Sequence, residues 1–349
     1  METLTEKYAA LGPEAGPKFW DLVVEVVASP FYEPSATKLA AEVLPQGRYV
    51  ERASGAARKP RAKVLPPSPS LAAVAGDEVY IRPNGAEYHA RKWGEHVDVV
   101  ALRKAREVTA KAFGGGSGSP MFVLAYGAPG CGKTALMEAA FGDELVTLMG
   151  TGDTEVSDLI GGYVQTPSGA FEWVDGGLVD AAENGKVYFI DEVGLIDPKV
   201  LSLVYGLMDG RRELTITANP DRGTIKAHPN FYVVAATNPN APGVRLSEAL
   251  LSRFTLQVEM TTDWNLSRKL GVSATMVTAA QNLAKKQASH EVSWAPQMRE
   301  LLAFRDAAEV FGTPWAIANL LAAAPEMDRP VVADVFTRAF GVDCKPAKI

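Results

Sequence analysis

The stretch Gly127-Ala-Pro-Gly-Cys-Gly-Lys133-Thr134 decides the fold of this chain. It lies between an apolar segment that predicts a strand, Met121 to Tyr126, and a segment that predicts a helix, Ala135 to Phe141. Glycines and Lys-Thr at this spacing, between a strand and a helix, form a P-loop whose free backbone N–H groups bind phosphate at the positive end of the helix. We expect Lys133 to reach the β and γ phosphates and Thr134 to bind Mg²⁺.

The predicted nucleotide site takes in the whole loop. Its members are Gly127, Ala128, Pro129, Gly130, Cys131, Gly132, Lys133 and Thr134. The alternative, a glycine-rich turn with only a structural role, is disfavoured by the strand and the helix on either side. Cys131 occupies a variable position of the motif, so we predict that its thiol packs inside the protein and takes no part in chemistry. The predicted cofactors are ATP and Mg²⁺.

Two carboxylates follow another apolar strand, Val187 to Ile190. Because the carboxyl ends of parallel strands meet at one edge of a sheet, Asp191 and Glu192 are expected beside the P-loop. Asp191 can hold the Mg²⁺ shell, and Glu192 can polarise the attacking water. Acidic residues also end strands as ordinary caps, but their place downstream of a P-loop favours the catalytic interpretation.

Two further polar residues complete the predicted site. Asn238 follows a strand predicted over 231–237, and its side-chain amide could orient the same water; the alternative is a turn residue before Pro239. Arg253 ends a helix predicted over 246–253. An arginine can stabilise the charge on a transferring phosphoryl group, and the site that Arg253 serves need not be its own.

The pattern of the chain predicts four regions: a small helical N-terminal region (1–50), a Pro- and Ala-rich basic linker (51–76), an α/β nucleotide-binding domain (77–262) and an all-helical domain (263–349). The linker's alternative role is a phosphate-binding arm on nucleic acid. In the α/β domain the sequence also predicts a helix over 97–112. The last domain is predicted to hold helices near 265–271, 273–287, 297–311, 314–323 and 329–340.

Composition narrows the class of protein. With 349 residues, 47% hydrophobic residues and a formal net charge of −6, the chain is typical of globular proteins and not of nucleic-acid coat proteins. Cys131 and Cys344 have no paired spacing and the four histidines no ligand spacing, so neither a disulfide framework nor a zinc site is predicted. We find no apolar run long enough for a membrane span and predict a cytoplasmic protein without a membrane partner.

The order of these motifs resembles the AAA+ ATPases. The segments between them resemble the MoxR-like, dynein-related (AAA_5-type) branch, which includes midasin, the CbbQ and NorQ activators and the CobS chelatase subunit. Residues 158–178 are similar to that branch's hairpin inserted in helix 2, and residues 213–230 to its pre-sensor-1 hairpin. Asp191-Glu192, Pro198-Lys-Val-Leu201 and Leu207-Met-Asp-Gly-Arg211 match the family pattern, and the resemblance covers about residues 78–340.

The resemblance implies an AAA+ core with a parallel sheet, two inserted β-hairpins and a C-terminal all-helical lid. Asn238 then matches sensor 1, Arg253 matches the arginine finger that acts in trans, and Arg299 matches the sensor 2 arginine. The segment Ala295-Pro-Gln-Met-Arg299 departs from the family's usual Ser-Pro-Arg sequence, so Arg305 is an alternative for the sensor 2 arginine. A finger that acts in trans implies a homo-oligomeric ring, usually a hexamer.

The resemblance also implies a function. The leading hypothesis is a chaperone-like ATPase that remodels or activates a partner protein, for which the family's relatives often use a von Willebrand factor A domain protein. The alternatives are the motor subunit of a CobS-like metal chelatase and a DNA-directed motor, although the acidic balance argues against nucleic acid.

Two sequence features leave their own alternatives open. The first is a group of aromatic residues that either contacts a partner chain or stabilises its own hairpin as a cross-strand cluster: Tyr163, Phe171 and Trp173. The second is the segment 266–277, whose pattern predicts either a helix-turn-helix or the first two helices of the lid.

Overall fold

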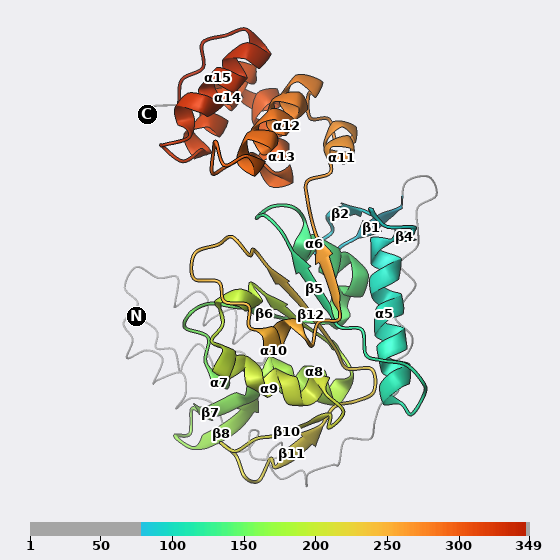
Figure 1. Cartoon of the computed structure of the whole chain (residues 1–349). Helices are drawn as coiled ribbons and strands as arrows, with labels where there is room; N and C mark the ends of the chain where they lie inside the picture. Colours follow the sequence, from blue (N-terminus) through green and yellow to red (C-terminus); the bar gives the residue numbers. More distant parts are fainter. Residues whose placement is uncertain (1–77, 347–349) are drawn as a thin grey trace, which may run out of the picture. The chain divides into compact units, whose positions relative to one another are not determined.

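The computed structural model describes residues 78–346 (Figure 1). The predictions for residues 1–50 and 51–76 lie outside the described residues. Within 78–346, no helix is long and apolar enough to cross a membrane.

A five-stranded parallel sheet forms the centre of the nucleotide-binding region. Its strand order is β13-β5-β12-β9-β6, and every neighbouring pair is parallel. The strands are β5 (Val123–Tyr126), β6 (Leu145–Met149), β9 (Val187–Asp191), β12 (Tyr232–Thr237) and β13 (Leu256–Glu259). All residues of β9 and β12 are buried, and the mostly apolar sequences that precede Asp191 and Thr237 are typical of inner strands of a parallel sheet.

The strand order places three predicted site segments at one edge. β12 pairs with β5 on one side and with β9 on the other. The P-loop follows β5, Asp191 ends β9, and Asn238 follows β12. The strand before Asn238 is therefore an inner strand of the sheet.

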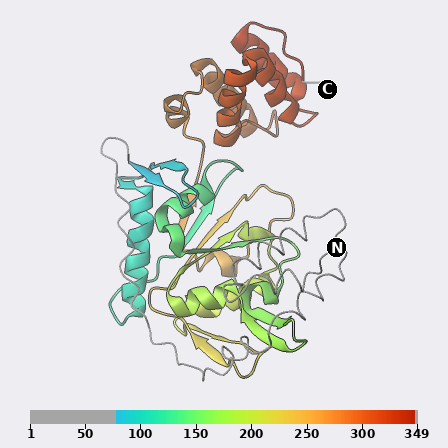
Figure 2. The same cartoon turned by 180° about the vertical axis from the view of Figure 1, so that it is seen from behind.

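Helices pack on this sheet. The predicted helix over 97–112 is α5, which contacts α6 and β12 and is drawn in cyan in Figures 1 and 2. Asp197 begins α9 by accepting the N–H of Lys199, with Pro198 in the first turn. The helices are α5 (Asp98–Phe113), α6 (Lys133–Phe141), α7 (Val156–Ile160), α8 (Gly177–Asn184), α9 (Pro198–Met208) and α10 (Glu248–Leu251).

Short antiparallel pairs surround the central sheet. Ahead of it, β1 (Val79–Ile81) pairs with β2 (Glu87–His89), and β3 (Lys92–Trp93) pairs with β4 (His96–Val97). The two hairpins expected from the family resemblance are also present. β7 (Gly161–Gln165) with β8 (Phe171–Asp175) lies between α7 and α8, and β10 (Glu213–Thr215) with β11 (Thr224–Lys226) lies between α9 and β12.

The C-terminal region is helical, as predicted. It consists of α11 (Trp264–Lys269), α12 (Ala274–Ala288), α13 (Met298–Phe311), α14 (Thr313–Ala323) and α15 (Arg329–Phe340). These helices bury their own apolar cluster, which includes Met276, Leu301, Leu321 and Phe336. Gly271, at φ +87°, turns the chain between α11 and α12.

Candidate nucleotide site

Glycines shape the P-loop. Gly127, Gly130 and Gly132 have φ values of +152°, +79° and +96°, a region that other residues rarely adopt. A Cβ atom at Gly127 would lie 2.1 Å from the carbonyl oxygen of Met260. Only glycine fits this close approach of two backbone segments.

Lys133 folds back over the loop. Its ammonium donates to the carbonyl oxygens of Gly127 at 2.9 Å and Ala128 at 3.1 Å, and the residue is only 6% exposed. It is also the first residue of α6, and no side chain caps that helix. The loop therefore offers an anion both a lysine ammonium and the N–H groups of an uncapped helix end.

Thr134 and Asp191 meet across the sheet edge. The hydroxyl of Thr134 donates to Oδ2 of Asp191 at 2.7 Å, although 57 residues separate them in the chain. Mg²⁺ prefers oxygen ligands of this type and takes its remaining ligands from phosphates and water. This donor pair fits the magnesium of a nucleotide complex.

Glu192 has a backbone conformation that is uncommon for a residue with a side chain. Its φ and ψ angles of 52° and 42° are left-handed, and it stands directly after β9. Its Oε2 accepts the backbone N–H of Asn238 at 3.3 Å. Such conformations cost about 1 kcal/mol or more and cluster at functional sites. The left-handed turn and the Asn238 contact together fix the carboxylate at the strand ends.

Asn238 forms hydrogen bonds through both its main chain and its side chain at this edge. Its backbone N–H donates to Glu192, and its side-chain Oδ1 accepts the N–H of Asn240 at 3.2 Å. The side-chain contact is that of a turn residue, which was one of the two interpretations of the sequence. The amide nitrogen of the same side chain remains the group that could orient water.

The thiol of Cys131 lies in the apolar core. It is 2% exposed, and burial raises its pKa. The position agrees with the packing role expected from the sequence.

Arg253 packs against α9. Its guanidinium carbon lies 4.2 Å from the ring centre of Tyr205, and Nη1 donates to the carbonyl oxygen of Ala249 at 2.8 Å. Among the contacts described for residues 78–346, none joins Arg253 to Thr134, Asp191 or Glu192. The structure thus does not bring Arg253 to the site of its own chain.

The two candidate sensor 2 arginines differ in their surroundings. Arg299 is the second residue of α13, and its Cβ lies 2.9 Å from the position that a Cβ on Gly130 would take. The guanidinium of Arg305 donates instead to the carbonyl oxygen of Leu270 and pairs with Asp306. Arg299 is therefore the candidate beside the P-loop.

Sequence reasoning missed Arg91. Its Nη2 donates to the carbonyl oxygen of Cys131, and its Nη1 donates to that of Thr261, both at 3.1 Å. No motif marks this arginine, because its partners are backbone carbonyls 40 and 170 residues away.

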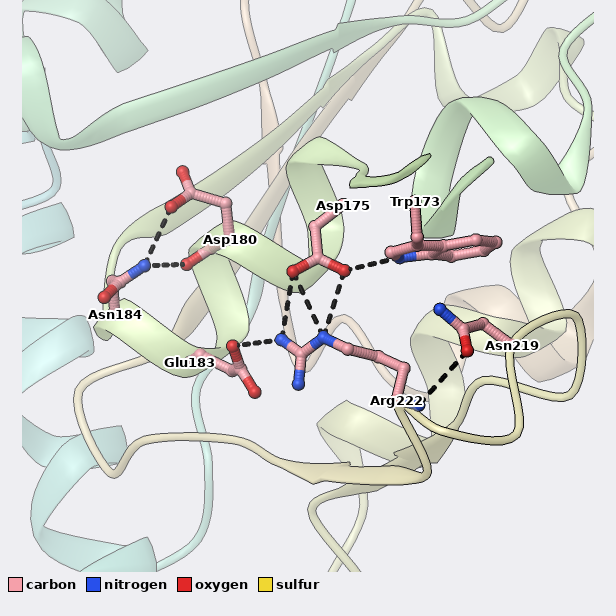
Figure 3. A network of polar contacts seen from close by, with 7 residues as sticks. All are labelled: Trp173, Asp175, Asp180, Glu183, Asn184, Asn219 and Arg222. Carbon is pink, nitrogen blue, oxygen red and sulfur yellow. Dashed lines mark hydrogen bonds and ion pairs between the residues drawn. The ribbon is translucent and has the colours of Figure 1, made fainter. Parts of the chain in front are cut away.

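A second unpredicted group joins the two inserted hairpins (Figure 3). Arg222, in the turn between β10 and β11, forms ion pairs with Asp175 at the end of β8 and with Glu183 of α8. The indole N–H of Trp173 donates to the same Asp175 at 2.7 Å.

Comparison with known proteins agrees with this geometry. Residues 122–254 match the family model of the AAA domain, dynein-related subfamily. Midasin of Dictyostelium discoideum is 36% identical over 146 residues, 39% of this chain and 2% of midasin. Protein NorQ of Paracoccus denitrificans is 38% identical over 120 residues, 34% of this chain and 43% of NorQ. The chain therefore spans less than half of each of these relatives.

A solved structure is also similar. NtrX from Brucella abortus matches with a TM-score of 0.40 and 16% identity over 70% of this chain and 60% of that chain. The family match begins at the strand before the P-loop, includes Lys133, Asp191, Glu192 and Asn238, and ends just after Arg253. These residues and this sheet order show that residues 122–254 form an AAA domain similar to the dynein-related subfamily, within a P-loop NTPase fold of the AAA+ type.

Proposed function

We propose that this protein hydrolyses ATP in a magnesium-dependent reaction and uses the energy to remodel or activate a partner protein. The observation that carries the proposal is the meeting of Thr134, Asp191 and Glu192 at one edge of the sheet. Thr134 donates to Asp191 at 2.7 Å, and Glu192 is held beside them by the N–H of Asn238.

Each residue has a distinct role in the proposed reaction. The loop amides and Lys133 bind the phosphates, while Thr134 and Asp191 hold Mg²⁺. The metal, when bound, neutralises charge on the β and γ phosphates. Glu192 accepts a proton from water as the water oxygen bonds to the γ-phosphorus. The bond from that phosphorus to the ADP oxygen breaks, giving ADP and phosphate.

An oligomeric ring, usually a hexamer in this family, is part of the proposal. Its support is Arg253, whose described contacts lie on α9 and α10 and away from its own site. A neighbouring subunit could receive this arginine as the finger in trans, and Arg299 is proposed as sensor 2. The ring would act on a client or adaptor, such as a von Willebrand factor A domain protein.

The helix-2 insert supplies a candidate contact for that partner. Phe171 is 67% exposed and Tyr163 54% exposed. Tyr163 also packs edge-to-face on Trp173 with ring centres 5.3 Å apart, so part of the aromatic group stabilises the hairpin itself. Phe171 is thus the aromatic side chain of this hairpin most free to touch a partner.

The test of hydrolysis is Glu192→Gln, which keeps the size of the side chain and removes the base. We expect the variant to bind ATP like the original protein and to lose turnover by about 10²–10⁴-fold. Glu107→Gln, an exposed glutamate of α5, is the matched control and should leave both quantities unchanged. Turnover by Glu192→Gln at the original rate would show that the base is another residue.

A separate assay tests the partner. The ATPase rate of the protein alone is compared with its rate in the presence of a von Willebrand factor A domain protein, of a metal-chelatase partner or of DNA. Stimulation by DNA alone would contradict remodelling of a protein client.

A further inference from the structure

We propose that Arg91 is a positioning residue of the nucleotide site, which fixes and polarises the P-loop through the carbonyl oxygen of Cys131. The inference rests on ATP binding at this loop, as proposed above. Arg91 lies between β2 and β3, and the family match begins only at residue 122.

The first step is the fixed orientation of the guanidinium. Arg91 is 16% exposed at its side chain, and its Nε lies 3.9 Å from Oδ2 of Asp98, which is 8% exposed. Tyr88 donates its hydroxyl to the same carboxylate, and the N–H of Asp98 donates to the carbonyl oxygen of Arg91 at 2.9 Å. A largely buried ion pair with these extra hydrogen bonds holds one geometry.

The second step is the peptide that Arg91 contacts. The carbonyl oxygen of Cys131 and the N–H of Gly132 belong to the same peptide group. Hydrogen bonds polarise one another along a chain, so a charged donor on this oxygen strengthens the N–H as a donor. Gly132 directly precedes α6, where loop N–H groups are expected to bind phosphate. Arg91 therefore acts on phosphate through the loop and needs no contact with the nucleotide.

The third step is the second carbonyl. Thr261 lies just after β13, in the segment that leads to α11. The same segment passes the loop closely, because the N–H of Met260 donates to Tyr126 and its carbonyl oxygen adjoins Gly127. By donating to both Cys131 and Thr261, one guanidinium ties the loop to this segment.

The structure offers a matched control. Arg103 of α5 also donates from its guanidinium to two backbone carbonyls, those of Ala140 at 2.7 Å and Ala139 at 3.1 Å. These oxygens lie at the opposite end of α6 from the P-loop. Removing Arg103 therefore tests the loss of a similar pair of hydrogen bonds without a contact on the loop.

The experiment measures equilibrium dissociation constants for ATP and ADP, together with urea unfolding, for Arg91→Met, Arg91→Lys and Arg103→Met. We expect Arg91→Met to weaken both nucleotides by about tenfold or more, since hydrogen bonds from charged groups are strong. Arg91→Lys should recover part of this loss, because lysine keeps the charge but lacks the fork that reaches two carbonyls. Arg103→Met should change stability and leave nucleotide affinity within threefold.

Binding is read without turnover, so a protein that binds but does not hydrolyse would contradict the proposed function and leave this inference standing. A change below threefold in folded Arg91→Met would overturn the inference. If Arg91→Met does not fold, Arg91→Lys decides by the same threefold limit. Equal weakening by Arg103→Met would also overturn it, because the effect would then follow general stability.

Discussion

The nucleotide edge of the sheet and the pair of inserted hairpins are held together in different ways. At the edge, the contacts join residues of the P-loop and of the strand ends: the Thr134 hydroxyl donates to Asp191, and the backbone N–H of Asn238 donates to Glu192. Between the hairpins, the described link is the partly exposed side chain of Arg222 with two carboxylates. The difference teaches that the order of parallel strands brings the side chains of the first region together, whereas the second region depends on an ion pair between two inserted segments.

This comparison predicts that changes at the edge alter chemistry and that changes at the hairpins alter local stability. The largest effect is expected for Arg253→Ala, because this arginine is proposed to act at the nucleotide edge of a neighbouring subunit. Loss of an arginine finger lowers turnover by about 10³-fold or more, while ATP affinity should stay close to that of the original protein.

Mixing provides the sharper measurement for Arg253. Arg253→Ala and Glu192→Gln subunits are each inactive alone, but in a mixed ring the second supplies the arginine and the first supplies the carboxylate. We expect ATPase activity to reappear on mixing. If the mixture stays inactive while mixed oligomers form, Arg253 does not act across subunits.

Lys133→Ala also tests the nucleotide edge, and its expected effect is smaller than that of Arg253→Ala. The variant loses the charged donor to phosphate, so the dissociation constant for ATP should rise by about 10–100-fold. Isothermal titration measures it, with Lys104→Ala on the exposed side of α5 as the control. Unchanged ATP affinity in Lys133→Ala would contradict the assignment of the loop as the phosphate-binding site.

Arg222→Gln is expected to have the smallest effect and the opposite character. Partly exposed ion pairs contribute about 1 kcal/mol or less, so unfolding should shift slightly while ATP affinity is unchanged. Asp175→Asn in a double-mutant cycle measures the coupling. A large loss of ATP binding in Arg222→Gln would erase the distinction between the two regions.

Acid should weaken the same contact. Burial raises the pKa of Asp175, but the hydrogen bonds from Arg222 and Trp173 outweigh it, and the net shift is downward. A carboxylate whose folded pKa is lowered contributes stability above its unfolded pKa of about 3.9 and loses it as pH falls below that value. The difference in stability between the original protein and Asp175→Asn should therefore shrink below about pH 4.

Local patterns predicted most of the fold. The helix over 97–112 and the five C-terminal helices are confirmed, because each carries apolar residues at helical spacing between clear stop signals. The helix predicted over 246–253 is shorter, spanning 248–251, because the hydroxyl of Ser247 accepts the N–H of Leu250 and begins the helix there.

Contacts between distant segments could not be predicted in the same way. The sequence predicts Asp191 beside the P-loop residue Thr134 only because a P-loop and a strand end are recognisable motifs. Arg91 and Arg222 have no such signal, since their partners become neighbours only when the chain has folded. The sequence also does not predict the left-handed backbone of Glu192, because this conformation is expected at glycine and not at glutamate.

The contact that holds Glu192 comes from the main chain of residue 238 and not from its side chain. Substitution at 238 can remove an amide without releasing the carboxylate. What controls the carboxylate is instead the alignment of β12 against β9, in which Ala235 lies opposite Ile190. A slip of one strand past the other would move the Glu192 carboxylate away from the N–H of residue 238, so the distance between these two groups is set by the register of the sheet.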